Sequence, residues 1–346
     1  MKSSLKNKEK HFSYIKFIYV LIKKIKKFYS KKNIKKIKFL FYFLSLFLII
    51  LFTYIIIFRK REYKNIQNYY ENNIKEKKGE IQPSWFKEKL IIHSLGKYNN
   101  FTYLNSLEPL KYWYFEKKMH LMEADFMLTK DNHTILAHDY IDFNFTPTLE
   151  QFKKLKTIGN TTRMSFKDLV LFMEENKNLY IMTDTKYTDI QRIEIEFDEM
   201  TAIINNKKDL YERFIIEIYN EKMFLFIKQK NYLFKYFVFT LYQRWEPING
   251  LEDLENIFIF CNKYKINGIL FFSYLLNESF LKFSRNYSIP IYLHTVNDIG
   301  NSVYFMNKGV KGIITDNITY ELLEKYLLDN NIQLNQANIY NNYYIF

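Results

Sequence analysis

Cysteine, proline and glycine are scarce in this sequence, which has one Cys, five Pro and eight Gly among 346 residues. The single cysteine, Cys261, excludes an internal disulfide and a zinc site built from cysteines. It follows an apolar run, so we expect it to lie in the core. The apolar fraction of 48% is ample for a core and fits one large domain or two ordinary ones.

Acidic residues are scarce at the N-terminus, which explains the net charge of +14. Residues 1–38 hold fourteen lysines against one glutamate, residues 59–64 add a charge of +3, and residues 65–346 have a net charge of −2. The basicity therefore belongs to an N-terminal tail and not to the folded body. This distribution removes the main support for a nucleic-acid partner, and we expect none.

One long stretch lacks charge altogether. Residues 39–58, FLFYFLSLFLIILFTYIIIF, run for twenty residues, enough for a helix to cross the ~30 Å hydrocarbon core. No small-residue cleavage site follows, so a cleaved signal peptide is disfavoured. Because lysines are massed before this transmembrane helix, residues 1–38 are predicted to be a basic cytoplasmic tail of a single-pass cell-membrane protein. The folded body of the chain is then extracytoplasmic. Residues 12–29 of the tail are predicted to form either a basic amphipathic helix on the inner leaflet or a solvated lysine-rich segment, and the sequence favours neither.

Residues 59–85 are polar and charged and predict a stalk, and residues 331–346 predict a C-terminal tail. Within 86–330, eight apolar strand-like runs alternate with segments of helical spacing. The runs are 89–93, 120–128, 179–186, 214–219, 236–242, 267–273, 289–296 and 311–315. A long insertion, 129–178, holds a turn, a short strand and two further helical patches. The alternation predicts an α/β fold of the TIM-type (β/α)8 barrel, with a doubly wound open sheet as the alternative.

Two carboxylates, Glu123 and Asp125, stand two residues apart at the end of an apolar run in MEADFMLTKDNHTILAHD. Positions i and i+2 of a strand point to one face, so both can converge on one hard divalent cation. After the TKDN turn, a second short run brings His138 back towards the same place, and His93 ends another apolar run. Two acidic ligands and two histidines at strand ends suit metal-assisted cleavage of a phosphodiester, with one imidazole as base and the other as acid.

Reacting groups in such barrels sit at the carboxyl ends of the strands. His93, Glu123 and Asp125 fall near strand ends, and four more polar residues do so: Asp184, Lys186, Thr295 and Asn297. We therefore expect these side chains to collect on one rim.

The order of these motifs resembles the glycerophosphodiester phosphodiesterase superfamily, which includes phosphatidylinositol phospholipase C-like enzymes. The resemblance covers about 89–320, through HSLG (93–96), NSLE (105–108), E-x-D (123–125), TKDN (129–132), HD (138–139), DTK (184–186), TVN (295–297) and GVKGIITD (309–316). HSLG, NSLE and DTK look closer to the bacterial, membrane-anchored phospholipase C-like branch than to the main glycerophosphodiesterases.

Three departures from the main branch concern the pocket. Ser94 and Leu95 stand where that branch has Arg and Gly, and the arginine would contact phosphate. His294 replaces a Trp before TVN and changes the pocket wall. Asp184 stands where Glu is common and is one methylene shorter, so it could ligate through water.

The resemblance and the residue types together imply roles for six side chains. Metal ligands are Glu123, Asp125 and Asp184, whose oxygen donors favour Mg²⁺ or Ca²⁺. Lys186 is expected to neutralise phosphate, and His93 and His138 form the acid–base pair. Secondary expectations are a loop-orienting Asp139, a capping box from Asn105 to Glu108, and pocket-lining roles for Tyr219 and Asn297.

These assignments predict a membrane-anchored, metal-dependent phosphodiesterase. Its substrate would be a glycerol- or inositol-type phosphodiester, either a small molecule or a lipid headgroup. One alternative is a metal-independent phospholipase C-like lyase that uses the two histidines alone. Another is a non-catalytic barrel that binds envelope phosphate or glycan.

Overall fold

The computed structural model describes residues 83–141, 143–241, 248 and 250–334, together with a few isolated residues before them. The chain divides into two units, Met1–Ile74 and Lys75–Phe346, and the elements below belong to the second. The predicted tail 1–38, span 39–58 and C-terminal tail lie largely outside the described residues, as does most of the stalk. Among the helices that the structure does describe, none is both long and apolar enough to cross a bilayer.

Eight parallel strands form a closed barrel, because β1 pairs with both β2 and β9. Their bounds are β1 Leu90–Ile92, β2 Leu121–Leu128, β4 Tyr180–Asp184, β5 Phe214–Ile218, β6 Tyr236–Thr240, β7 Ile269–Phe272, β8 Ile291–His294 and β9 Gly312–Thr315. Each lies within one of the eight apolar runs, so the barrel prediction is confirmed and the open-sheet alternative is wrong.

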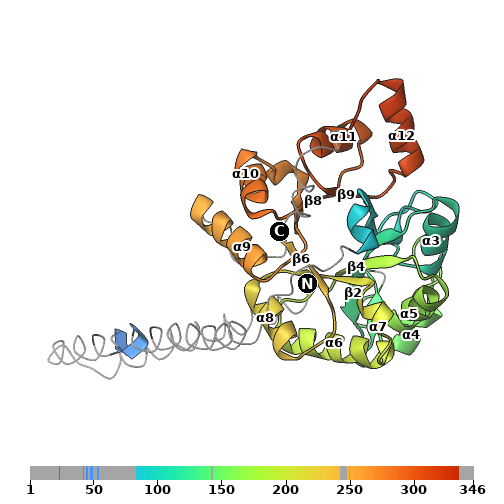
Figure 1. The fold of residues 1–346 in the computed structure, drawn as a ribbon. Coiled ribbons are helices and arrows are strands. Elements are labelled where there is room, and N and C mark those ends of the chain that lie inside the picture. The colour runs from blue at the N-terminus through green and yellow to red at the C-terminus, as the bar shows by residue number, and fades with distance from the viewer. Residues whose placement is uncertain are drawn as a thin grey trace. The chain divides into compact units, whose positions relative to one another are not determined.

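Helices surround the strands, as Figure 1 shows for the barrel unit. Those that follow barrel strands are α3 Leu107–Lys111, continued by the π-helix η4 Tyr112–Glu116, then α6 Ile190–Ile204, α8 Glu221–Gln229, α9 Leu251–Lys263, α10 Glu278–Tyr287, α11 Ile299–Asn307 and α12 Tyr320–Asp329. A short helix, α7 Lys208–Tyr211, precedes β5. Apolar faces at helical spacing pack them against the sheet; in α6, Ile193, Phe197 and Met200 are buried.

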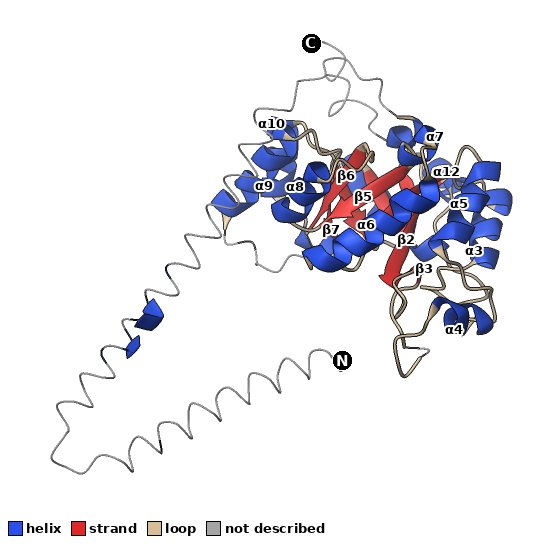
Figure 2. Ribbon diagram, turned by 90° about the horizontal axis from the view of Figure 1, so that it is seen from below, coloured by secondary structure: helices blue, strands red, loops and turns tan. Residues whose placement is uncertain are grey.

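The insertion after β2 builds a small subdomain on the rim of the barrel. Its elements are β3 Thr134–Leu136, antiparallel to the outer part of β2, and the helices α4 Leu149–Lys154 and α5 Phe166–Glu175. Thr148 and Ser165 begin these two helices with capping boxes. Ile135, Phe143 and Phe152 form a satellite core beneath them. Figure 2 shows β2 extending past the other strands towards β3 and α4.

The barrel interior is divided into layers. One apolar residue from each barrel strand forms the lowest layer with Trp85, the set being Ile91, Leu121, Met182, Ile215, Val238, Leu270, Tyr292 and Ile314. Trp85 belongs to a short 3-10 helix, η2 Ser84–Lys87, and closes this amino-terminal end. Two residues further along β2, β4, β5 and β6, the inward positions become Glu123, Asp184, Glu217 and Thr240. Because side chains alternate in a strand, this change creates a polar layer directly above an apolar one.

Candidate active site

Three carboxylates converge at the carboxyl end of the barrel. One oxygen from each of Glu123, Asp125 and Asp184 lies within 4.8 Å of the others, and all three side chains are buried. Glu123 and Asp125 come from alternate positions of β2, and Asp184 ends β4 opposite Asp125. The predicted i, i+2 convergence on β2 is therefore found, with the neighbouring strand supplying the third acid.

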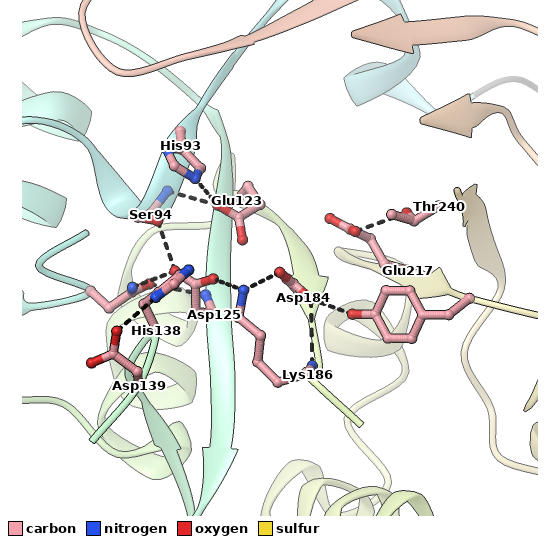
Figure 3. A network of polar contacts seen from close by, with 12 residues as sticks. His93, Ser94, Glu123, Asp125, His138, Asp139, Asp184, Lys186, Glu217 and Thr240 are labelled. Carbon is pink, nitrogen blue, oxygen red and sulfur yellow. Dashed lines mark hydrogen bonds and ion pairs between the residues drawn. The ribbon is translucent and has the colours of Figure 1, made fainter. Parts of the chain in front are cut away.

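Lys186 lies against this cluster. Its Nζ is 2.5 Å from Asp125 Oδ1 and also pairs with Asp184 Oδ2 (Figure 3). Burial of the ammonium lowers the pKa of Lys186, but the negative charges of Asp125, Asp184 and Glu123 have a larger effect and raise it. Burial would raise the pKa of the Asp125 carboxyl group, yet the positive charges of Lys186, His138 and His93 lower it below the usual range.

Glu123 behaves in the opposite way to Asp125. Burial, followed by the charges of Asp125, Asp184 and Glu217, raises its pKa well above the ordinary value, and Lys186 only partly offsets this. The cluster thus concentrates more negative charge than one ammonium compensates. An oxygen-only donor set that is buried and excessively negative fits a hard divalent cation such as Mg²⁺ or Ca²⁺. Glu123, Asp125 and Asp184 are the residues that would hold it.

His93 follows β1 directly and lies on the other side of Glu123. Its Nδ1 is 2.7 Å from Asp316 Oδ1, and its Nε2 is 3.9 Å from Glu123 Oε2. Asp316 is fixed in turn by the Asn297 amide, at 2.5 Å, and by its own backbone N–H, which donates to Asn297 Oδ1. Burial opposes ionisation of Asp316, but the His93 hydrogen bond and charge lower its pKa. The Asp316 carboxylate therefore orients His93 with Nε2 towards the acidic cluster.

The turn after β1 donates hydrogen bonds to two of the carboxylates. Ser94 donates its backbone N–H to Glu123 and its hydroxyl to Asp125, both at 2.7 Å. Its backbone is left-handed, as are the next two residues, ending at Gly96 with φ 99. A Cβ at Gly96 would lie 2.1 Å from the Trp113 ring, so only glycine fits this turn. Ser94 therefore positions two of the three acids.

Asn105 is part of this network and not of a helix cap. Its amide donates to Asp125 Oδ2 at 2.6 Å, and its carbonyl oxygen accepts from the Asp125 backbone N–H. The helix N-cap is Ser106, without a side-chain capping bond, and Glu108 instead accepts from Thr162. The predicted capping box is therefore wrong, because a buried carboxylate competes for the asparagine.

His138 reaches the rim from the loop after β3. The Ala137 backbone N–H donates to the Asp125 carbonyl at 3.0 Å, which fixes the height of the loop. His138 Nδ1 lies 3.0 Å from Asp139 Oδ2, as expected for an orienting aspartate, and both side chains are about half exposed. The Tyr103 ring lies between the two histidines, with its centroid 4.7 Å from that of His93 and 4.8 Å from that of His138.

The remaining wall comes from β5, β6 and β8. Tyr219 donates its hydroxyl to Asp184, and Thr240 donates to Glu217 Oε2 at 2.8 Å. Burial and the neighbouring His93 lower the pKa of His294 to about 3, so this ring is neutral at physiological pH. Its centroid lies 4.8 Å from that of His93, in the wall position predicted for it.

The structure thus brings together the six side chains that were assigned catalytic or metal-binding roles, with His138 at the exposed edge. Tyr219 and Asn297 join them through Asp184 and Asp316. Sequence reasoning assigned no site role to Ser94, Tyr103, Glu217 and Asp316. Asp316 carried the clearest signal, because a strand-end aspartate closes the GVKGIITD motif. Glu217 also carried one, as a lone acid within the apolar run FIIEI.

No family model and no curated protein matches this sequence. Solved structures do match its fold. A glycerophosphodiester phosphodiesterase from Parabacteroides distasonis aligns with a TM-score of 0.55 at 16% identity, covering 71% of this chain and 100% of that one. A putative glycerophosphodiester phosphodiesterase from Galdieria sulphuraria aligns with a TM-score of 0.55 at 15% identity, covering 69% and 97%.

A third neighbour is an Oleispira antarctica phosphodiesterase in complex with the product sn-glycerol-3-phosphate. It aligns with a TM-score of 0.54 at 13% identity, covering 70% of this chain and 98% of that one. At these identities the likeness concerns the arrangement of the chain in space. The barrel unit therefore has the fold seen in glycerophosphodiester phosphodiesterases.

Proposed function

We propose that this protein is a membrane-anchored, metal-dependent phosphodiesterase that hydrolyses glycerol- or inositol-type phosphodiesters. The observation that carries the proposal is the buried Glu123–Asp125–Asp184 cluster with Lys186 against it and a histidine on either side. A phosphodiester is an anion that requires charge neutralisation, a base and an acid. The sn-glycerol-3-phosphate bound by the Oleispira antarctica neighbour supports a glycerol-type substrate.

The bound cation would neutralise the phosphate and stabilise the charge that develops in the transition state. Lys186 provides a second positive group at the same place, since its ammonium already contacts two of the three acids. The hydrogen bonds from Ser94 and Asn105 hold Asp125 in one orientation. Such preorganisation lowers the cost of assembling the charged complex.

The two histidines differ in their surroundings, and this difference suggests separate roles. His93 is buried, and Asp316 binds its Nδ1, so its Nε2 can accept a proton from the attacking hydroxyl or water. His138 is half exposed on a loop at the edge of the site, where a leaving alcohol would depart. We therefore assign His93 as the general base and His138 as the general acid.

A metal-independent lyase is the second candidate, because Lys186 alone already pairs with Asp125 and Asp184. In that mechanism a substrate hydroxyl gives its proton to His93 and attacks phosphorus. The P–O bond to the leaving alcohol breaks, His138 protonates that alcohol, and a cyclic phosphate remains. The excess negative charge reflected in the raised pKa of Glu123 favours the metal-dependent mechanism.

The decisive experiment measures turnover of a panel of glycerol- and inositol-type phosphodiesters with Mg²⁺, with Ca²⁺ and after exhaustive chelation. We expect activity to vanish on chelation and to return with one of the two cations. Glu123→Gln should lower kcat by on the order of 10²-fold or more, because the cation loses a charged ligand. Glu194→Gln is the matched control, because Glu194 lies on α6 and forms an exposed ion pair with Lys230 at the end of α8.

Each outcome of this experiment has a meaning. Full activity after chelation would favour the metal-independent lyase. Failure of the whole panel with both cations would favour a non-catalytic barrel. Unchanged kcat in the Glu123→Gln protein would remove this residue from the site.

Membrane anchoring is proposed from the sequence alone. Support comes from the twenty uncharged residues of 39–58 and the fourteen lysines that precede them. The barrel would then lie outside the cytoplasm at the end of the stalk 59–85, with a phosphodiester molecule or lipid headgroup as its partner.

A further inference from the structure

Tyr103 contacts both imidazoles of the proposed acid–base pair, although the proposed function gives it no role. Its ring centroid lies 4.7 Å from that of His93, with the ring planes at 86°. It lies 4.8 Å from that of His138, with the planes at 63°. Edge-to-face arrangements at such distances are favourable contacts between aromatic rings. One half-exposed side chain therefore packs against the proposed base and the proposed acid.

The two histidines depend on Tyr103 to different degrees. His93 is buried, and Asp316 binds its Nδ1 at 2.7 Å. Among the described residues, the hydrogen-bond and ring partners of His138 are Asp139 and Tyr103. Asp139 follows His138 directly in the same loop and is itself half exposed, so it moves with the histidine. The Tyr103 ring is therefore the contact that relates the His138 imidazole to the rest of the site.

The backbone beside His138 is fixed, but this does not fix its ring. The Ala137 N–H donates to the Asp125 carbonyl at 3.0 Å and holds the chain at that point. The side chain of His138 keeps two torsions, and exposed side chains change rotamer within picoseconds to nanoseconds. A general acid must lie within hydrogen-bond reach of the oxygen that it protonates. A neighbour that restricts rotation of this imidazole therefore contributes to catalysis.

Tyr103 can supply this restriction because the loop around it is anchored. After it, Leu104 is buried, and Asn105 is bound to the acidic cluster through both ends of its amide. Before it, Tyr98 and Phe101 exchange two backbone hydrogen bonds of 2.9 Å. The residues on both sides of Tyr103 are thus held by contacts that do not involve the histidines.

The backbone of Tyr103 itself is left-handed, with φ 59. A bulky residue adopts this region rarely, because its Cβ lies close to a backbone carbonyl oxygen. Asn99 and Asn100 of the same loop share it, as is common for asparagine. A tyrosine persists there only where the surrounding structure holds it, and residues held in this way gather at functional sites. The anchored loop therefore keeps the Tyr103 ring against the histidines at a conformational cost.

The phenol of Tyr103 does not transfer a proton itself. Burial, followed by the charges of Asp316 and Asp125, raises its pKa above the ordinary value. The hydroxyl therefore stays neutral in the range where imidazoles titrate. The ring makes the contacts with both histidines, so a phenylalanine would preserve them.

We propose that Tyr103 is a positioning residue whose ring orients His138 for protonation of the leaving alcohol. This inference rests on the proposed function and adds a residue to its acid half. The step concerned breaks the P–O bond to the leaving group. His138 gives its Nε2 proton to the departing oxygen and becomes neutral, while Asp139 stays bound to its Nδ1.

The test compares Tyr103→Ala with Tyr103→Phe in the full chain, using two diesters of glycerol phosphate. One diester releases an alkyl alcohol, and the other releases nitrophenol, which leaves without a general acid. On the alkyl diester, Tyr103→Ala should lower kcat at least about tenfold with little change in KM, because a displaced acid protonates less often. On the nitrophenyl diester its kcat should match that of the unmodified protein, which also shows that the barrel is folded. Tyr103→Phe should match the unmodified protein on both.

Tyr304→Ala is the matched control, because Tyr304 is also about half exposed but lies on the outer helix α11. It should change neither rate. Combining Tyr103→Ala with His138→Ala should cost no more than His138→Ala alone, since the ring acts through that imidazole. Equal losses on both diesters, equal losses in Tyr103→Phe and Tyr103→Ala, or losses that multiply in the double variant would overturn the proposal.

Chemical reactivity provides a readout that needs no turnover. Diethyl pyrocarbonate modifies accessible imidazoles, and mass spectrometry locates each product. Tyr103→Ala should accelerate modification of His138 but not of His133, which is similarly exposed and is held by Glu199. Faster modification of His138 without hydrolysis of any diester would reject the phosphodiesterase and keep the orienting contact. Hydrolysis with unchanged reactivity and unchanged kcat in Tyr103→Ala would keep the phosphodiesterase and overturn the inference.

Discussion

At the residue scale, the contact between His93 and Asp316 predicts that catalysis depends on the charge of Asp316. Asp316→Asn keeps the shape of the side chain but removes the charge that orients the imidazole. We expect kcat on a glycerophosphodiester to fall by on the order of 10²-fold or more. The KM should change little, because Asp316 faces the histidine and not the acidic cluster. A fall in substrate affinity with unchanged kcat would contradict the positioning role.

The division of labour between the two histidines can be tested with leaving groups. A nitrophenyl phosphodiester releases an already acidic alcohol and needs no general acid. It should therefore partly rescue His138→Ala but neither His93→Ala nor Asp316→Asn. Rates of the three variants on nitrophenyl and alkyl diesters provide the measurement. Equal rescue of both histidine variants would reject the assignment.

Periodicity in the sequence predicted the acidic cluster, because alternation along one strand places Glu123 beside Asp125. It could not predict Ser94 or Tyr103. Their contacts depend on a left-handed turn after β1 and on a loop that folds back over the barrel. Asn105 shows the same limit, since its pairing with Asp125 is a tertiary contact that overrode the local capping signal.

At the element scale, the eight strands were predictable because buried parallel strands are short continuous apolar runs. Closure of the barrel could not be predicted from any single apolar run. It depends on the pairing of β1 with β9, whose residues are more than two hundred positions apart. The pairing of the outer part of β2 with β3 confirms the hairpin that the TKDN turn predicted.

Helix α6 contains a buried acid that makes a stability prediction. Glu196 is fully buried, and among the described residues neither of its carboxylate oxygens has a hydrogen-bond partner. Burial, then the charges of Asp184 and Glu199, raise its pKa well above the ordinary value. The folded state therefore holds the proton more tightly than the unfolded chain does. The stability that Glu196 contributes is fully present below its unfolded pKa and is lost as pH rises.

Glu196→Gln should remove this dependence. The gain in the free energy of unfolding over the unmodified unit should be larger at pH 8 than at pH 5, as measured by urea denaturation of residues 75–346. Glu194→Gln on the exposed side of α6 is the control and should give the same small difference at both pH values. A Glu196→Gln difference that does not vary with pH would show that the carboxyl group is not held protonated.

At the scale of the whole molecule, the charge asymmetry predicts the orientation in the membrane. The lysines of residues 1–38 should remain in the cytoplasm, so protease added to intact cells should digest the 75–346 unit and spare the tail. Antibodies against each part, before and after permeabilisation, provide the readout. Digestion of the tail with protection of the barrel would reverse the topology.

The His93–Asp316 contact joins positions that are 223 residues apart. This separation determines how long the ribosome takes to add Asp316 after it has added His93. At about 5–20 residues per second, roughly 10–45 s pass between synthesis of the histidine and synthesis of its aspartate. Throughout that interval the nascent chain already carries Glu123, Asp125 and Asp184, but its general base lacks an orienting partner. The proposed site is therefore complete only at a late stage, when β9 closes the barrel and Asp316 reaches His93. A chain that stalls before residue 316 would lack the carboxylate that orients His93.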